Sequence, residues 1–316
     1  MKTGIYLSYI GLGANLLHLS YCHQIAKKNG PVTIITLCKN LEAALADDPL
    51  IEKVIYINQY HKKLIDVFKL GKVLKKFDFQ NLLIFYPSIR LYISAKLAGI
   101  KNIWIYNFFK KKNLHLVHAA KKLTEDFLKI NNCPTETKFY IKKEKLNKIN
   151  QDLDQNKFKI VIGAGSSGPT TKWGAKKYSE LINRLNILDE YFFFILCGPN
   201  EKDIENEIIS NLNKKNYILL SDKNIKDLIP YLCVSDMYVG NDSFGSHITS
   251  QSGKKSIVML LDSPKAYTDY SSNHFRMVPN GFNLDDIKHG TAADPNLISV
   301  DDVIENINRL KTNLNY

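Results

Sequence analysis

The chain has 316 residues, of which 45% are hydrophobic and 23% charged, so it can bury a sizeable core and is not expected to be disordered. This length suits two domains of about 150 residues each. The formal net charge of +12 is uneven, because residues 1–150 carry 25 Lys/Arg against 10 Asp/Glu, whereas residues 151–316 carry 18 against 21. A basic first half (+15) and a mildly acidic second half (−3) indicate two modules with different partners, although a lysine-rich surface that keeps the chain soluble explains the charge equally well.

The five cysteines are widely spaced, odd in number and without a CxxC pair, which argues against a zinc site or a disulfide framework and favours a reducing cytoplasm. An apolar run between Lys2 and Cys22 has some features of a signal peptide, but Asn15 and His18 interrupt it. No stretch reaches the roughly 18 apolar residues of a membrane-spanning helix, so the sequence predicts a soluble protein.

In the first half, strand and helix patterns alternate. Apolar runs predict strands at residues 4–10, 32–37, 53–57, 82–86 and 103–106, and helical patterns cover residues 14–28 and 114–130. This β-α-β order predicts a parallel sheet with right-handed crossovers. The polar and charged residues 138–157 read as an interdomain linker with room for a short helix.

The same alternation restarts after the linker. Strands are predicted at residues 158–162, 191–196, 217–220, 237–240 and 256–261, with helices between them. Pro230 is expected to kink or split a helix over residues 225–233, and Ser299 with Asp302 is a capping pair for the last helix. We therefore predict two Rossmann-like, doubly wound α/β domains, 1–150 and 151–316, facing a cleft at the carboxyl ends of their strands, with a last helix free to pack back on the N-terminal domain.

The strongest local signal lies at residues 239–247, where a strand ends at Gly240 and a helix opens near Gly245. The N–H groups and positive dipole end of such a helix favour a phosphate, and Ser243, Ser246 and His247 can donate to the same group. An ordinary strand-to-helix turn with Asp242 as the helix cap explains these residues about as well.

A second signal is the loop of residues 163–173, rich in glycine, serine and threonine, which directly follows a strand. Its glycines permit close approach of a ligand, its hydroxyls donate hydrogen bonds, and Lys172 supplies a positive charge. Residues 163–168 also fit G-x-G-x-x-G, but a dinucleotide site needs a helix that opens at the glycines, and Pro169 intervenes. A P-loop is excluded, because the chain contains no G-x-x-x-x-G-K-[ST].

Other candidates are weaker. Glu201, at the start of a helix after Gly198, could hold ribose hydroxyls, although acidic residues are common at helix starts. The turn at residues 11–15 lacks the third glycine of a dinucleotide fingerprint. His115 and His118 lie on a helical pattern without metal-ligand spacing and read as structural.

Together these motifs resemble those of the heptosyltransferase-like glycosyltransferases of family 9, which have the two-domain GT-B fold. Residues 163–165 with Lys172 and Trp173 resemble that family's small-residue loop, and residues 240–243 with His247 are similar to its Asn-Asp-[Thr/Ser]-Gly-x-x-His motif, with Phe244 in place of the glycine. The resemblance covers nearly the whole chain: Gly198 with Glu201 resembles the start of a family helix, residues 77–90 resemble the acceptor-domain strand and helix, and residues 298–303 resemble the closing helix.

The resemblance implies a metal-independent, inverting transfer of a sugar from a nucleotide diphosphate, with ADP-heptose the donor in the best-known members, and no cofactor. The second domain would bind the donor and the basic first domain an anionic acceptor, typically a lipopolysaccharide core, with a peripheral contact at the inner membrane and no nucleic acid partner. The lysine run at residues 110–112 is one basic candidate for that contact. The implied donor-binding residues are Gly163, Ser166, Thr170, Lys172, Glu201, Asp242, Ser243, Gly245 and His247, and the acceptor-side residues are Gly13, Asn15, Ser88 and Arg90.

One departure concerns the mechanism. Family members usually carry an aspartate after the first-strand glycine as the general base, and this chain has Ala14 there. Asn15 is not a base, and His18, about one helical turn further on, is the candidate replacement, although a core-facing histidine explains it as well. The leading hypothesis is a cytoplasmic glycosyltransferase of cell-envelope synthesis; the alternatives are a nucleotide-sugar-binding protein without transfer activity and, third, an NAD-dependent oxidoreductase.

Overall fold

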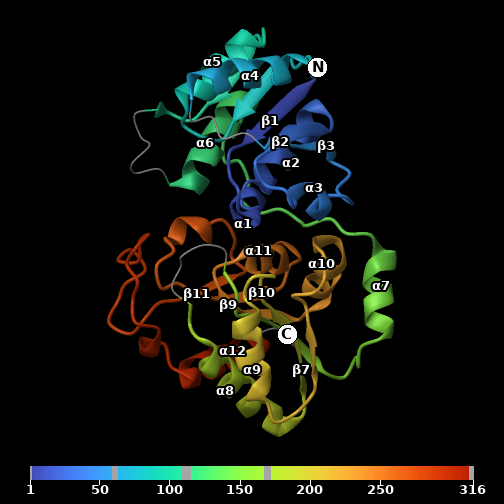
Figure 1. Cartoon of the computed structure of the whole chain (residues 1–316), viewed down its shortest axis with the longest axis vertical. Coiled ribbons are helices and arrows are strands. Elements are labelled where there is room, and N and C mark those ends of the chain that lie inside the picture. The colour runs from blue at the N-terminus through green and yellow to red at the C-terminus, as the bar shows by residue number, and fades with distance from the viewer. Residues whose placement is uncertain (1, 59–62, 109–114, 167–171, 313–316) are drawn as a thin grey trace. The chain divides into compact units, whose positions relative to one another are not determined.

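The computed structural model describes residues 2–58, 63–108, 115–166 and 172–312. It divides into two compact units, Met1–Tyr140 (unit 1) and Ile141–Tyr316 (unit 2), and each is described by itself. Both are α/β units built on one parallel sheet (Figure 1). In the described part of the chain, no helix is both long enough and apolar enough to cross a bilayer.

The sheet of unit 1 has the strand order β3-β2-β1-β4-β5, with every pair parallel. Its core forms because the central strands are largely apolar and are buried on both faces, as expected for a parallel sheet covered by helices. The strands are β1 (Thr3–Leu7), β2 (Val32–Thr36), β3 (Ile51–Tyr56), β4 (Asn81–Ile84) and β5 (Asn102–Ile105), and the helices are α1 (Leu12–Leu16), α2 (Leu19–Asn29), α3 (Leu41–Ala44), α4 (Leu64–Lys75), α5 (Ile89–Leu97) and α6 (Leu116–Leu128).

Unit 2 has a sheet of order β11-β10-β9-β6-β7-β8, again parallel throughout. Its strands are β6 (Phe158–Gly163), β7 (Tyr191–Leu196), β8 (Tyr217–Leu219), β9 (Met237–Asn241), β10 (Lys255–Met259) and β11 (His274–Met277). Its helices are α7 (Lys143–Gln151), α8 (Ala175–Leu185), α9 (Lys202–Ser210), α10 (Ile225–Val234), α11 (Phe244–Gln251) and α12 (Val300–Thr312), with short 3-10 turns η2 (Asn186–Leu188), η3 (Lys265–Tyr267) and η4 (Pro295–Leu297).

The last helix begins as the sequence predicts. The Ser299 hydroxyl accepts from the Asp302 N–H at 3.1 Å, and the Asp302 carboxylate accepts from the Ser299 hydroxyl at 2.6 Å, which is a capping arrangement. The apolar face of α12 buries Val303 and Ile307 in the core of unit 2, where α12 packs against α8.

One helix prediction was wrong, and a second was wrong for one of its two alternatives. The helix expected over residues 14–28 is broken into α1 and α2, because the carbonyl of Ala14 accepts from the His18 ring Nδ1 (2.7 Å) while the His18 N–H bonds to Asn15 instead. Pro230 does not split its helix: α10 runs through it. The carbonyl that loses its helical donor there belongs to Lys226, an exposed residue in the first turn, where solvent can replace the missing N–H.

Candidate functional site

The two glycine-containing motifs of unit 2 meet at the point where the strand order reverses. From β6 the chain builds outward to β7 and β8, then returns to β9 on the other side of β6. Gly163, the last residue of β6, and Gly240, the residue before the last of β9, are register partners. Ligands of open α/β sheets bind outside the carboxyl ends of the strands at such a reversal, so the fold brings both motifs to the expected position.

Close packing explains the glycines at the carboxyl ends of β6 and β9. A Cβ on Gly163 would lie 1.9 Å from the Tyr238 hydroxyl, and a Cβ on Gly240 would lie 2.4 Å from the carbonyl oxygen of Gly163. Gly245 is similarly enclosed, since its Cβ would lie 2.6 Å from a methyl carbon of Leu196. These three glycines let the loops after β6 and β9 approach each other more closely than side chains would permit.

Asn241 joins the two loops. Its side-chain N–H donates to the carbonyl of Ala164 (2.7 Å), and its side-chain oxygen accepts from the Trp173 backbone N–H (3.0 Å). The Trp173 indole is buried in the core of unit 2 and donates to the Ile298 carbonyl at 2.9 Å. The loop between β6 and α8 is therefore held at Ala164 and at Trp173. Lys172 directly precedes the buried Trp173.

Glu201 is the N-cap residue of α9, and it forms a hydrogen bond with the loop that follows β6. Its carboxylate accepts from the N–H groups of Gly198 (2.7 Å) and Ser166 (3.0 Å), and the Lys172 ammonium lies 3.4 Å from the same carboxylate. Lys172 and Glu201 remain partly exposed, with side-chain accessibilities of 26% and 17%. The structure thus brings three predicted donor-side residues (Ser166, Lys172 and Glu201) into one cluster, in which Glu201 positions the loop.

The helix start after β9 places Asp242 and Ser243 at the same edge. Ser243 is the first cap of α11 and lies 3.0 Å from the Tyr238 hydroxyl, whereas the buried Ser246 hydroxyl donates to the Ser243 carbonyl at 2.8 Å. Ser166 donates to the carbonyl of Asp242 at 3.3 Å, which ties the two loops together. The Ser246 hydroxyl is therefore engaged within the first turn of α11. Asp242 and Ser243 lie between the carboxyl end of β9 and the start of α11.

Burial shifts the pKa values of Asp242 and His247. The carboxyl of Asp242 has a side-chain accessibility of only 12%, and this desolvation raises its pKa to about 6, with Asp262 adding to the rise and a hydrogen bond to Ser263 opposing it. His247 is buried, and desolvation together with nearby His274 holds its pKa well below the ordinary value.

His247 in turn is held by Tyr270. Its Nδ1 is 2.8 Å from the Tyr270 hydroxyl, the two rings are stacked, and its Nε2 is 3.8 Å from Asp242. At neutral pH we therefore assign a neutral imidazole to His247 and an ionised carboxylate to the neighbouring Asp242. Sequence reasoning missed Tyr270, because nothing in the spacing of residues 247 and 270 links them before the chain is folded.

Unit 1 has its own strand reversal, between β1 and β4, and the predicted acceptor-side residues follow these two strands. Gly13 and Asn15 are on α1. Asn15 is buried and bonds to the carbonyls of Tyr9 (3.0 Å) and Gly11 (2.7 Å), so it shapes the turn. Ser88 caps α5 by accepting from its third N–H at 3.4 Å, and Arg90 is exposed in the first turn.

His18, the candidate base, is completely buried. Its Nδ1 bonds to the Ala14 carbonyl (2.7 Å), its Nε2 lies 3.1 Å from the Tyr106 hydroxyl, and its ring stacks on Tyr9. Desolvation lowers its pKa to about 4, against a smaller opposing effect of the Ala14 bond. Both nitrogens are engaged inside unit 1, so the geometry describes a core histidine; at Ala14 the chain has a half-buried methyl group.

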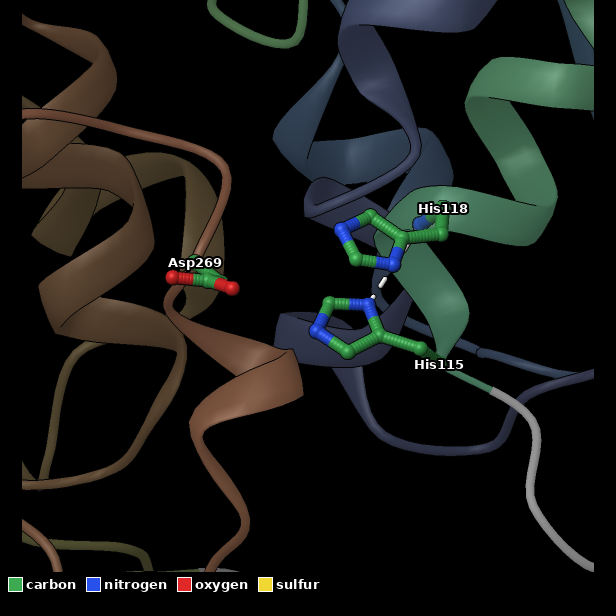
Figure 2. Close-up of side chains that lie close together, drawn as sticks. All are labelled: His115, His118 and Asp269. Atoms are coloured by element: carbon green, nitrogen blue, oxygen red, sulfur yellow. Dashed lines mark hydrogen bonds between the residues drawn. The ribbon is translucent and has the colours of Figure 1, made fainter. Parts of the chain in front are cut away.

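His115 and His118 open helix α6 of unit 1 (Figure 2). The His115 ring accepts from the His118 N–H at 3.4 Å, and the two rings stack with centroids 3.8 Å apart. This supports the structural interpretation of the pair. Asp269, also drawn there, belongs to unit 2 and pairs with Arg276. Thr170 and the lysine run at residues 110–112 lie outside the described residues.

Two parallel-sheet units of this kind define the GT-B class of fold. The sequence model of glycosyltransferase family 9 (heptosyltransferase) matches residues 96–284, more than half of the chain, and the chain belongs to that family. No curated protein matches it by sequence.

Several solved structures share the fold. ADP-heptose LPS heptosyltransferase II of E. coli is 15% identical with a TM-score of 0.77, covering 100% of both chains. A family 9 glycosyl transferase from Veillonella parvula DSM 2008 has the same identity and TM-score, with 98% of this chain and 97% of that one covered. E. coli heptosyltransferase WaaC, solved with ADP-2-deoxy-2-fluoro heptose, is 12% identical with a TM-score of 0.72 over 98% and 99% of the chains. The GT-B fold predicted from the motifs is thus confirmed.

Proposed function

We propose that this family 9 glycosyltransferase moves a heptose or similar sugar from a nucleotide diphosphate to a cell-envelope glycan, with a lipopolysaccharide core as the representative acceptor. The observation that carries the proposal is the cluster at the strand reversal of unit 2. There Lys172 and Glu201 lie 3.4 Å apart, and Asp242 and Ser243 stand at the start of α11. A cation and a helix start beside the ends of parallel strands suit a diphosphate.

Each donor-side residue receives a role from its environment. Lys172 and the N–H groups at Ser243 and Gly245 would offset the negative charge of the diphosphate, so that transfer proceeds without a metal ion. Asp242, ionised at neutral pH, would accept hydrogen bonds from sugar hydroxyls. Glu201 keeps the Lys172 loop in place through its backbone hydrogen bonds and uses its remaining lone pairs for the ribose.

The proposed transfer is a single displacement. An acceptor hydroxyl oxygen bonds to the anomeric carbon, the bond from that carbon to the diphosphate oxygen breaks, and the configuration inverts. The nucleoside diphosphate leaves with the bonding electrons, and the hydroxyl proton passes to a base. The basic first half, with 25 Lys/Arg against 10 Asp/Glu, suits an anionic acceptor, which we place at the cytoplasmic face of the inner membrane.

Thermal unfolding with ADP, UDP, GDP, CMP and NAD added separately tests the donor site. ADP is the first candidate, because WaaC of this fold was solved with ADP and with an ADP-linked heptose analogue. Ligand at 100 times its dissociation constant should stabilise the protein by about 2.7 kcal/mol. We expect one nucleoside diphosphate to do so in the wild type and in the control Asp222→Ala, whose residue is an exposed aspartate of unit 2, but not in Asp242→Ala. A shift with NAD alone would overturn the proposal.

The oxidoreductase alternative has little support in the geometry of the loop. Among the residues that the structure describes, the next helix after β6 begins at Ala175, and a Cβ on Gly165 would lie 2.1 Å from a carboxylate oxygen of Glu201. A dinucleotide fingerprint needs the helix start at the glycines, with room for the pyrophosphate beside them.

The second candidate function is donor binding without transfer. It is favoured by the complete burial of His18 and by the methyl group at Ala14. The test is Ala14→Asp, with Ala14→Asn as the matched control, measured as release of nucleoside diphosphate from the donor in the presence of an acceptor glycan. If residue 14 is the base position, the aspartate should raise the rate by about 10²–10⁴ and the asparagine should not. Equal rates in both variants and the wild type would remove residue 14 from the mechanism.

A further inference from the structure

Two neighbouring helices of unit 1 expose an unusual number of large apolar side chains. On α4 and α5 they recur at helical spacing on the outward side, with relative exposures of 77% for Leu64, 56% for Ile65, 56% for Phe68, 61% for Ile89, 43% for Ile93 and 49% for Leu97. Each helix has a separate buried face, Val67, Leu70 and Leu74 on α4 and Leu91 and Ala95 on α5. The exposed residues are therefore additional to the core-facing stripe that an amphipathic surface helix needs.

The two helices lie side by side, so these residues form one surface (Figure 1). The Ser94 hydroxyl of α5 donates to the Val67 carbonyl of α4 at 3.0 Å. A Cβ on Gly71 of α4 would lie 3.2 Å from the Cβ of Leu97 on α5. Because Gly71 lets the helices approach this closely, the apolar residues of both belong to one patch, here called the α4–α5 face. Contiguous apolar patches of this kind mark interaction sites.

The segment that carries the α4–α5 face is strongly basic. From residue 63 to residue 101 the chain has eight basic residues and two acidic ones, and all eight basic residues are exposed. One of the two acidic residues, Asp66, accepts from the Lys63 N–H at the start of α4. The basic residues are Lys63, Lys69, Lys72, Lys75, Lys76, Arg90, Lys96 and Lys101, and the other acidic residue is Asp78.

We propose that the α4–α5 face docks unit 1 onto an anionic lipid bilayer. Leu64, Phe68 and Ile93 would enter the boundary between headgroups and acyl chains while the surrounding lysines pair with lipid phosphates. Charge argues against a second copy of the chain as the occupant, because two such faces would bring like charges together. The binding partner is therefore a surface with an apolar interior and negatively charged headgroups, that is, a membrane that contains acidic phospholipids.

This inference deepens the proposed function and rests on it for the presence of a membrane-linked acceptor. Docking by these helices would hold unit 1 at the membrane surface where the acceptor lies. The local concentration of the acceptor around the enzyme would then be higher. The docking itself needs neither donor nor transfer, so it can be tested with vesicles that contain no glycan.

The experiment measures co-sedimentation of the full chain with vesicles of phosphatidylcholine, with and without phosphatidylglycerol, at low and high salt. The apolar variant is Leu64→Ser/Phe68→Ser/Ile93→Ser, and the charge variant is Lys69→Glu/Lys72→Glu/Lys96→Glu. Matched controls on unit 2 are Ile187→Ser/Leu188→Ser, two exposed apolar residues, and Lys142→Glu/Lys143→Glu/Lys148→Glu, which changes the net charge equally. Thermal unfolding of each variant with and without ADP tests folding and the donor site separately.

We expect the wild type and both controls to bind the phosphatidylglycerol vesicles, and both face variants to bind at least about tenfold more weakly. High salt should weaken binding of the wild type, since screening shortens the reach of the lysines. No binding of the wild type, or equal losses in face and control variants, would refute membrane docking even if ADP still stabilises the protein. A wild-type dimer in light scattering that the apolar variant converts to a monomer would show instead that a second copy covers the face.

Discussion

Replacing Asn241 by alanine should destabilise unit 2 and weaken nucleotide binding at the same time. The Asn241 side chain donates to the Ala164 carbonyl and accepts from the Trp173 N–H, and all three residues are at most 3% exposed. Alanine would leave one buried carbonyl and one buried N–H without these partners. Each such loss costs about 1–3 kcal/mol, so the free energy of unfolding should fall by about 2–6 kcal/mol. A fall of about 3 kcal/mol corresponds to about 6–12 °C in Tm.

The chain has two tryptophans, one in each unit, which makes the assay direct. In a Trp104→Phe background, the fluorescence of Trp173 reports the urea unfolding of unit 2 and the binding of ADP next to Lys172. The matched control is Asn186→Ala. Asn186 is also buried and hydrogen-bonded, to Asn216, but it precedes β7 and so lies at the opposite edge of the sheet.

Both alanine variants should lose stability, and only Asn241→Ala should also lose ADP affinity, because only Asn241 fixes the loop that carries Lys172. A loss of stability below about 1 kcal/mol would refute the hydrogen-bond argument. Equal ADP affinities in the two variants would refute the claim that Asn241 builds the donor site.

Three further predictions concern charge. Glu201→Gln should destabilise unit 2 by about 1–3 kcal/mol and weaken ADP binding about tenfold, because the charge that fixes the Lys172 loop is lost; urea unfolding with wild-type stability would contradict this. Lys172→Ala should weaken ADP binding about tenfold and flatten its salt dependence in calorimetry, whereas Lys176→Ala, an exposed lysine of α8, should match the wild type. The pKa of His18, lowered by burial from 6.5 to about 4, means that unfolded unit 1 takes up a proton that the folded unit refuses, so stability should fall by up to about 3 kcal/mol from pH 6.5 to pH 4. His18→Gln should remove that part of the slope when Trp104 fluorescence is followed, and an unchanged slope would contradict the assignment.

Most of the strands were predictable because they are short buried runs. β7 occupies the predicted residues 191–196, and the other predicted strands differ at their ends. β11 was not predicted, because it is a strand of only four residues that contains His274 and Arg276 and is only partly buried. α4 was not predicted either, because its apolar residues lie on both its buried and its outward side and obscure the helical period. The exposed apolar residues of α4 thus form part of the α4–α5 face and also explain why the helix was not predicted.

The candidate site was predictable where its residues are close together in the chain. Glycines and a lysine after a strand indicate a ligand loop from their chemistry alone, and residues 240–247 indicate a helix start. The partners that set the electrostatics were not predictable, since Tyr270 reaches His247 and Asp262 reaches Asp242 only through the order of the strands. Likewise, nothing in the local pattern distinguishes a buried His18 from one that faces a ligand.

The two sheets use the same topological device with different chemistry. At the reversal in unit 2, glycines remove side-chain bulk, and Lys172, Glu201 and Asp242 lie in the segments that follow the strands. At the reversal in unit 1, the corresponding space is filled by aromatic rings: Tyr9 stacks on His18, and its hydroxyl donates to the Phe85 carbonyl at 2.9 Å. This packing buries His18, engages both of its ring nitrogens inside unit 1 and lowers its pKa to about 4, so the imidazole is a weak base with no nitrogen left for a substrate hydroxyl. If the enzyme transfers a sugar, the proton of the acceptor hydroxyl must therefore leave through a group other than His18, and Ala14→Asp supplies such a group at the position where the family places it.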